Sequence, residues 1–173
     1  LADRLGGIWA QAGVFGYDSI STAFAWMALI SYALRLYFDF WGYSMMAMGL
    51  ARMLGFELPE NFRTPYAAKS VSEFYRRWHI TLGAWFRDYI YFPLGAGRGG
   101  KLKAARNLMI VYTVSGLWHG AALKYVAWGM LNGALQVIEG LIPHSDKKPK
   151  FPKLDLLMHI LWTDFLILIT MLI

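Results

Sequence analysis

The apolar stretches of this chain constrain its fold more than any other feature of the sequence. Hydrophobic residues make up 57% of the chain, and the mean hydropathy is +0.37, which is high for a domain that folds in water. Several stretches approach the roughly 20 residues that an α-helix needs to cross hydrocarbon. We therefore predict an all-α polytopic membrane protein, a bundle of transmembrane helices and interfacial or re-entrant helices.

The first half of the chain holds two candidate membrane helices. Residues 20–38 form the first predicted span. Residues 42–56 are rich in glycine and alanine, which favours either a second span or a helix buried in the bundle, because small residues let helices approach closely. Residues 57–65 contain two prolines and scattered charges, and they predict a loop.

The second half predicts a helical hairpin and a last span. Residues 107–143 are too long for one untilted span, and the glycines near their middle favour a break. We expect one helix at residues 107–119 and another at residues 124–142, after a basic, glycine-rich turn at residues 95–106. Residues 156–173 form the last predicted span, and no linker or repeat divides the chain.

Charge and cysteine content exclude several classes of function. The formal net charge of +6 is compatible with nucleic-acid binding, but the basic residues lie among aromatic residues beside apolar stretches, which a position at a membrane surface explains more economically. The absence of cysteine excludes disulfides, thiol nucleophiles and cysteine-ligated metals. His144 and His159 show no ligand spacing and no carboxylate cluster accompanies them, so no metal site is expected.

Residues 70–97 are rich in both charge and aromatic rings. Ser70 and Glu73 form an S-x-x-E capping box, which predicts that a helix begins there. Apolar side chains then recur at helical spacing on one face, with arginines mostly off it, as in a helix that lies at a membrane interface. The members of this apolar face are Phe74, Trp78, Leu82, Trp85 and Tyr89. His79 is expected inside this helix.

His119 is one of two candidate catalytic residues. It lies in the apolar sequence Ser115-Gly-Leu-Trp-His119, and a neutral, buried imidazole suits a general base. A histidine that bonds across helices as a structural residue is the alternative. Ser115, one helical turn earlier, could be a nucleophile that His119 activates, although a serine in such a helix more often bonds to its own backbone.

The other candidates lie in the interfacial helix, except Trp118, which precedes His119. His79 is the second candidate catalytic residue, and a solvated polar position is the alternative. Three arginines could bind a phosphate-bearing donor or could anchor the chain to anionic lipid. Two tryptophans are tentative members of the same donor site, with packing or an interfacial belt as the alternative. These five residues are Arg76, Arg77, Trp78, Arg87 and Trp118.

An ordered set of short stretches resembles the membrane-bound O-acyltransferase family, and within it the bacterial alginate O-acetyltransferase branch. The resemblance covers residues 34–139. The stretches that carry it are YFDF (37–40), PENF (59–62), PY (65–66), SEFYRRWHI (72–80), WFRDY (85–89), PLG (93–95) and GLWHG (116–120).

This resemblance implies an enzyme of the bacterial inner membrane with several spans, of which residues 1–173 are one partial domain that is cut at both ends. The implied reaction passes an acyl group, expected to be acetyl, to a hydroxyl of an exported cell-envelope polysaccharide. The expected donor is acetyl-coenzyme A or another acyl thioester, with no tightly bound cofactor. The expected partners are the lipid bilayer, the donor, and the polysaccharide or an extracytoplasmic acyltransferase partner, but no nucleic acid.

The resemblance also suggests roles for single residues. The family's essential histidine, in its W-H-G motif, matches His119, and its other recurrent histidine, in R-R-W-H, matches His79. The chain departs from the family where many members carry a third histidine, because Asn132 stands there. It also has Trp41 and Met45 where relatives often have serine and an acid. A membrane transporter and a non-catalytic scaffold for an acyltransferase remain the alternatives from other classes.

Overall fold

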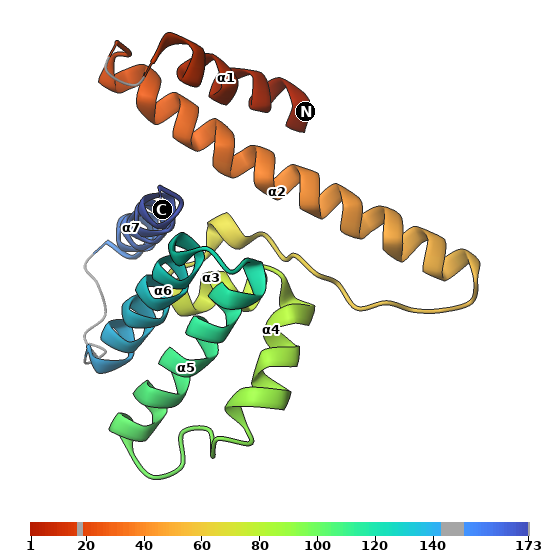
Figure 1. Ribbon diagram of the computed structural model, residues 1–173, viewed down its shortest axis with the longest axis vertical. Helices are drawn as coiled ribbons and strands as arrows, with labels where there is room; N and C mark the ends of the chain where they lie inside the picture. The colour runs from red at the N-terminus through yellow and green to blue at the C-terminus, as the bar shows by residue number, and fades with distance from the viewer. Residues whose placement is uncertain (17–18, 143–150, 173) are drawn as a thin grey trace. The chain divides into compact units, whose positions relative to one another are not determined.

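The computed structural model describes residues 1–16, 19–142 and 151–172, which are helical with no strand (Figure 1). The all-α prediction is therefore confirmed for these residues. The chain divides into two compact units, Leu1–Glu60 and Asn61–Ile173.

The first unit is a pair of antiparallel helices, α1 (Ala2–Phe15) and α2 (Thr22–Met53) (Figure 1). The hydroxyl of Ser21 accepts a hydrogen bond of 3.2 Å from the amide of Phe24 and so caps α2. The two helices pack through buried small residues and one ring pair, Trp9 and Tyr32, whose centroids are 4.8 Å apart. Small side chains at this contact allow the helices to approach closely.

The division of residues 20–38 and 42–56 into two helices was wrong. Residues 22–38 and 42–53 belong to the single 32-residue helix α2, and residues 20–21 and 54–56 lie outside it. Asp39, between the two stretches, lies exposed inside the helix, where its carboxylate needs no buried partner. The loop expected at residues 57–65 is confirmed up to residue 64, and the short 3₁₀ helix η1 (Pro65–Ala67) follows it.

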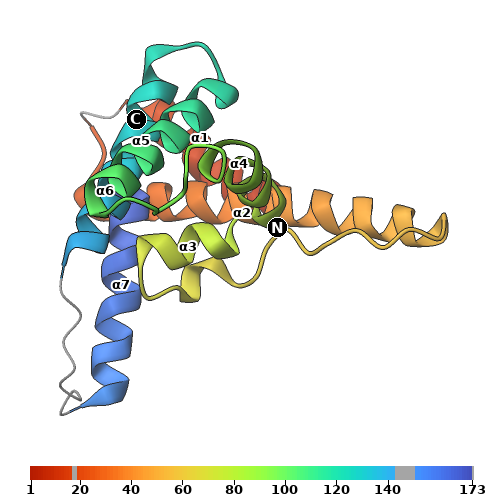
Figure 2. The same cartoon turned by 90° about the horizontal axis from the view of Figure 1, so that it is seen from below.

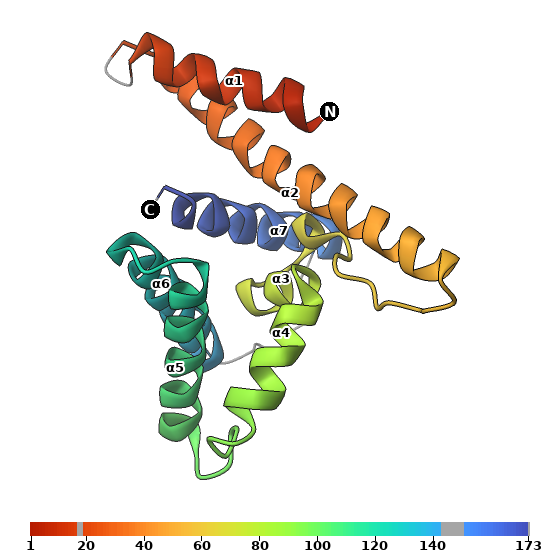
Figure 3. The same cartoon turned by 45° about the vertical axis from the view of Figure 1, so that its right-hand side comes forward.

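The second unit is built on a hairpin of α5 (Lys101–His119) and α6 (Leu123–Leu141), which run side by side in Figure 1 and Figure 3. Glycines bring the two backbones together. A methyl group at Gly129 would collide with the carbonyl oxygen of Tyr112, and one at Gly116 would collide with that of Tyr125. The predicted break between these helices is confirmed.

Helix α5 begins six residues earlier than expected, so Lys101, Lys103 and Arg106 of the predicted turn lie in its first turns, while Arg98 stays in the turn. Before it, residues 92–99 form the turn, in which Gly95 and Gly99 have positive φ angles of 92° and 96°, and Gly100 follows with 97°. The buried side chain of Asn107 fixes it by donating to the carbonyls of Leu94 (2.9 Å) and Ala96 (2.8 Å).

The predicted interfacial helix is in fact three pieces: α3 (Val71–Arg77), α4 (Ile80–Phe86) and the π-helical turn η2 (Arg87–Tyr91). The predicted start is confirmed, because the Ser70 hydroxyl accepts from the Glu73 amide at 3.0 Å. The carboxylate of Glu73, however, accepts from the amide of Lys69 at 2.9 Å and not from that of Ser70.

The interruption lies at His79, which was expected inside one continuous helix. Trp78 is extended and His79 is left-handed, with φ 47° and ψ 54°. Backbone hydrogen bonds to the preceding loop replace the helical ones: the Ile80 amide donates to the Asn61 carbonyl, and the Arg63 amide donates to the Arg77 carbonyl, both at 2.9 Å. The loop therefore ends α3 and starts α4.

The last helix, α7 (Pro152–Thr170), packs beside α3, as Figure 2 shows. A cluster of buried hydrophobic residues forms around this contact: Ala68, Val71, Phe74 and Ile167. Part of the last predicted span, residues 156–170, is thus helical. His144 and part of the second basic stretch, residues 147–150, lie outside the described residues.

Among the described residues, no helix combines the length and the apolarity required of a membrane span.

Candidate active site

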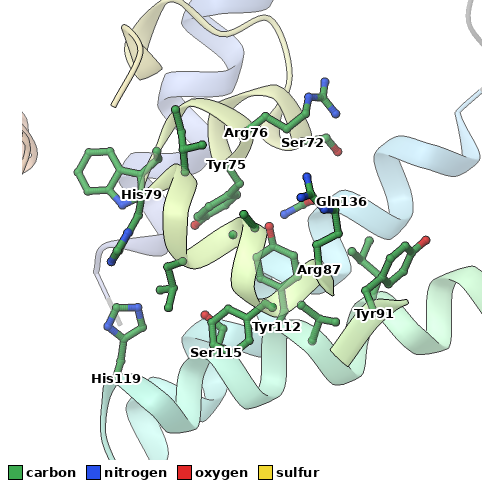
Figure 4. Close-up of a pocket in the computed structure, with 18 of the residues that line it drawn as sticks. Ser72, Tyr75, Arg76, His79, Arg87, Tyr91, Tyr112, Ser115, His119 and Gln136 are labelled. Atoms are coloured by element: carbon green, nitrogen blue, oxygen red, sulfur yellow. The ribbon is translucent and has the colours of Figure 1, made fainter. Parts of the chain in front are cut away.

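A cavity of about 460 Å³ lies in the second unit, between α3, α4 and η2 on one side and α5 and α6 on the other (Figure 4). Its size falls in the range of small-molecule sites. Most of the surface of its wall is apolar, although about half of the lining residues also carry a polar side-chain atom. Those polar lining residues are Ser72, Tyr75, Arg76, His79, Arg87, Tyr91, Tyr112, Ser115, His119 and Gln136.

The interruption between α3 and α4 places His79 in this cavity. Its ring atom Nδ1 lies 3.1 Å from the side-chain oxygen of Asn61, which also accepts from the amide (3.3 Å) and the hydroxyl (3.0 Å) of Thr81. Because a carbonyl oxygen accepts, Nδ1 carries the proton and Nε2 is the ring's acceptor atom. Asn61 therefore fixes both the tautomer and the orientation of His79.

His79 and His119 lie at the same end of the cavity (Figure 4). The ring of Trp118 bridges them, with its centroid 6.2 Å from that of His79 and 4.9 Å from that of His119. Burial, and secondarily the charge of His119, lower the pKa of His79 to about 4. His79 is thus a neutral imidazole at physiological pH.

The expectation that His119 is buried is wrong for the described part of the chain. His119 is the last residue of α5, and it is exposed at the edge of the cavity. A helix end leaves its final side chain with few covering neighbours. The ring of Trp128 on α6 lies edge-on to it, with centroids 5.1 Å apart.

Two polar side chains of α6 hold α3 in place. The two carboxylate oxygens of Glu139 accept from the amides of Val71 and Ser72, each at 2.9 Å. One carboxylate thus satisfies two amides that a helix leaves unpaired at its start. One turn of chain further along α3, the hydroxyl of Tyr75 donates to the side-chain oxygen of Asn132 at 2.7 Å.

The structure separates the predicted donor-binding residues into two groups. Arg76, Trp78 and Arg87 line the cavity. Arg87 is exposed and pairs with Asp88 at 2.8 Å, whereas Arg76 has no carboxylate partner in the described part of the chain.

Arg77 and Trp118 are not among the lining residues. The guanidinium of Arg77 pairs with Glu73 at 2.5 Å and donates to the carbonyl of Thr64 at 3.3 Å, so it stabilises the local turn. The hydrogen bond from Lys69, followed by the charge of Arg77, lowers the pKa of Glu73. Trp118 is 58% exposed beside the two histidines.

Sequence reasoning did not find several residues of the site. Asn61, Tyr75, Tyr112, Gln136 and Glu139 were assigned no role. One signal was present in the sequence, because Asn132, Gln136 and Glu139 recur at the helical spacing of four and three residues in an otherwise apolar stretch. Ser115 lines the cavity, but no hydrogen bond joins it to His119 among the described residues.

Several known proteins are similar to this chain in sequence. The chain is 45% identical over 137 residues to a probable alginate O-acetylase AlgI of Pseudomonas syringae pv. tomato, an alignment that covers 79% of this chain and 26% of that protein. It is 39% identical over 155 residues to a peptidoglycan O-acetyltransferase of Helicobacter pylori, covering 88% and 29%. It is 33% identical over 131 residues to a teichoic acid D-alanyltransferase of Bacillus subtilis, covering 71% and 33%.

The chain thus spans between about a quarter and a third of the length of these curated relatives. The sequence model of one family, the membrane-bound O-acyltransferases, matches residues 14–172, which include the cavity and both histidines. The chain belongs to the membrane-bound O-acyltransferase family.

Proposed function

We propose that this protein transfers an acyl group, acetyl in the first instance, from a thioester donor to a hydroxyl of an exported cell-envelope polysaccharide. We also propose that it does so as a multi-pass protein of the bacterial inner membrane. The family membership supports the acyl transfer and the membrane location. The names of the relatives, which act on alginate, peptidoglycan or teichoic acid, support a cell-envelope acceptor or an extracytoplasmic partner that passes the acyl group on.

The observation that carries the proposal is the position of His79 and His119 at one end of the cavity. They come from different elements, 40 residues apart in the sequence, and the interruption at His79 is what brings them together. A residue held in the left-handed region despite its side chain is typical of a functional site. The exposed edge at His119 gives an acceptor access to the donor in the cavity.

The chemistry that we propose starts with proton transfer. A ring nitrogen of His119 takes the proton of the acceptor hydroxyl while the hydroxyl oxygen forms a bond to the acyl carbon. The carbon–sulfur bond of the thioester then breaks, and the departing sulfur takes the proton from the His119 imidazolium. His79 remains neutral, held through Nδ1 by Asn61, and positions the reacting groups through Nε2.

Arg76 is the best placed of the predicted donor-binding residues. It lines the cavity, it is exposed, and it has no carboxylate partner among the described residues, so its guanidinium is available to a phosphate of the donor. Arg77, which is occupied by Glu73 and Thr64, is not proposed for this role.

The experiment is a measurement of acyl groups on the cell's polysaccharide. A deletion strain is complemented with the intact protein or with its His119→Ala form, at equal membrane levels, and acetate and D-alanine are released by mild alkali. We expect release only with the intact protein. His159→Ala is the matched control, because His159 is exposed on α7 outside the cavity. Equal release from His119→Ala would contradict the proposal.

A further inference from the structure

The turn between η2 and α5, together with the first turns of α5, concentrates positive charge. No acidic residue occurs in the sequence between Asp88 and Glu139, and Asp88 itself pairs with Arg87 at 2.8 Å. The four basic side chains of this segment are exposed, and none of them forms an ion pair with a carboxylate of the described residues. We call this surface the basic tip, and its basic members are Arg98, Lys101, Lys103 and Arg106.

One buried side chain fixes the conformation of the basic tip. Asn107 is 0% exposed, and its amide donates to two carbonyls of the turn at 2.9 and 2.8 Å. Its side-chain oxygen accepts from the guanidinium of Arg106 at 2.8 and 3.1 Å. The side chain of Lys103 lies over Gly99, since a methyl group there would come within 2.7 Å of it. The tip therefore holds like charges together in one arrangement, and an anionic partner would offset their repulsion.

Exposed apolar side chains occur within the basic tip and just before it. Leu102, which stands between two lysines in the sequence, is 85% exposed. Trp85, Tyr89 and Phe92 are also exposed, and the rings of the first two lie with centroids 5.2 Å apart. A soluble anion would leave these side chains in water. The interface of a lipid bilayer instead accepts leucine and aromatic rings together with basic groups.

The basic tip lies far from the catalytic candidates. The turn is at the end of the α5–α6 hairpin opposite the connection between these two helices, as Figure 1 and Figure 3 show. Lys101 and His119 are the first and last residues of α5, which places them about 27 Å apart at 1.5 Å per residue. A partner bound at the tip would therefore not touch the two histidines.

We propose that the basic tip binds the head groups of anionic phospholipids and inserts Leu102 among the acyl chains. An anionic lipid presents a net negative head group and acyl chains together, so it matches both the charges and the apolar side chains of this surface. Nucleic acid or free phosphate matches only the charges. This inference rests on the membrane location within the proposed function, and it names the class of lipid that one surface of the protein selects.

The test is a local cross-linking measurement. The full-length protein is placed in nanodiscs with equal amounts of phosphatidylglycerol and phosphatidylcholine, one of which carries a photoactivatable diazirine, and labels on residues 92–106 are located by mass spectrometry. We expect phosphatidylglycerol to label this segment about fivefold more than phosphatidylcholine, the factor for one basic residue at an anionic surface. The triple variant Arg98→Gln/Lys101→Gln/Lys103→Gln should be labelled equally by both lipids.

The matched control is Arg52→Gln/Lys124→Gln/Lys153→Gln, which removes three basic charges at exposed positions outside the basic tip. It should keep the wild-type preference at residues 92–106. The variant Leu102→Gln separates insertion from charge: we expect it to lower labelling by both lipids and to leave their ratio unchanged.

Equal labelling of the wild type by both lipids, or a preference that survives the triple substitution at the tip, would overturn this inference. Loss of the preference in millimolar inorganic phosphate at constant ionic strength would assign the tip to a soluble phosphate and would overturn it as well. Extraction of the full-length protein from membranes by alkaline carbonate would refute the proposed membrane location. An integral protein that prefers phosphatidylglycerol at the tip but transfers no acyl group would support this inference and refute the proposed reaction.

Discussion

The left-handed backbone of His79 determines where its imidazole lies. A side chain in this region costs about 1 to 2 kcal/mol, and the structure offsets this through the Asn61 side chain and the backbone hydrogen bond from Ile80 to Asn61. The sequence motif identified the residue but not its conformation. Nothing local marks residue 79 for positive φ, because the partner that enforces it lies 18 residues earlier.

His79 should stay neutral at pH values well below those at which histidine ordinarily becomes protonated. Burial, followed by the charge of His119, lowers its pKa to about 4. An unfolded histidine titrates near 6.5, so the unfolded state binds more protons between these values. The contribution of His79 to stability is therefore present above pH 6.5 and is lost as the pH falls towards 4. Nitrogen NMR of histidine-labelled protein measures this pKa directly.

The His79→Gln variant provides the control. Its spectrum lacks only the imidazole nitrogen signals of His79 and so identifies them in the wild-type spectrum. We expect that signal to show a proton on Nδ1 and no titration between pH 7 and 5. A midpoint near 6.5 would show that His79 is solvated, and it would remove the argument that Asn61 and burial hold the neutral form.

At the scale of elements, α6 organises the site. Its polar residues hold α3 through Glu139 and Asn132, and its glycines admit α5 at close range. The presence of helices α5 and α6 was predictable from the length of the apolar stretch at residues 107–143. The break between them was predictable from the glycines near its middle. The split of the interfacial helix was not predictable, because an uninterrupted apolar stripe at spacings of three and four residues is equally compatible with one helix or two.

The contact between α5 and α6 should depend on Gly129. A methyl group there would meet the Tyr112 carbonyl oxygen and lie 3.1 Å from the α-carbon of Gly116, and overpacking of this kind costs about 1 to 3 kcal/mol. We expect Gly129→Ala to lower the midpoint temperature of thermal unfolding of the purified protein in detergent. Size-exclusion chromatography after heating measures this midpoint.

Gly140→Ala is the control for this substitution. It makes the same change in the same helix, where no atom lies within 4 Å of the added carbon. Alanine has the higher helix propensity, so this variant should be as stable as the wild type or more stable. Equal midpoints for the two variants would show that the glycine contact does not hold the hairpin together.

At the scale of the whole molecule, family membership was predictable from short motifs that follow one another in a fixed order. These motifs can be recognised even where the predicted bounds of the helices are wrong. Helix boundaries were less predictable. The helices predicted at residues 20–38 and 42–56 are parts of one helix, because the exposed carboxylate of Asp39 between them is compatible with a continuous helix. The burial of His119 was also mispredicted, since apolar neighbours in sequence do not cover the end of a helix.

We propose that acyl transfer takes place at the histidine end of the cavity. The most direct test measures transfer from acetyl-coenzyme A by the full-length protein in membranes, comparing wild type, His119→Ala and His159→Ala at matched levels. Loss of a general base should lower kcat by about 10² to 10⁴-fold in His119→Ala, while His159→Ala keeps the wild-type rate. A His119→Ala enzyme that transfers acetyl at the wild-type rate would contradict this account.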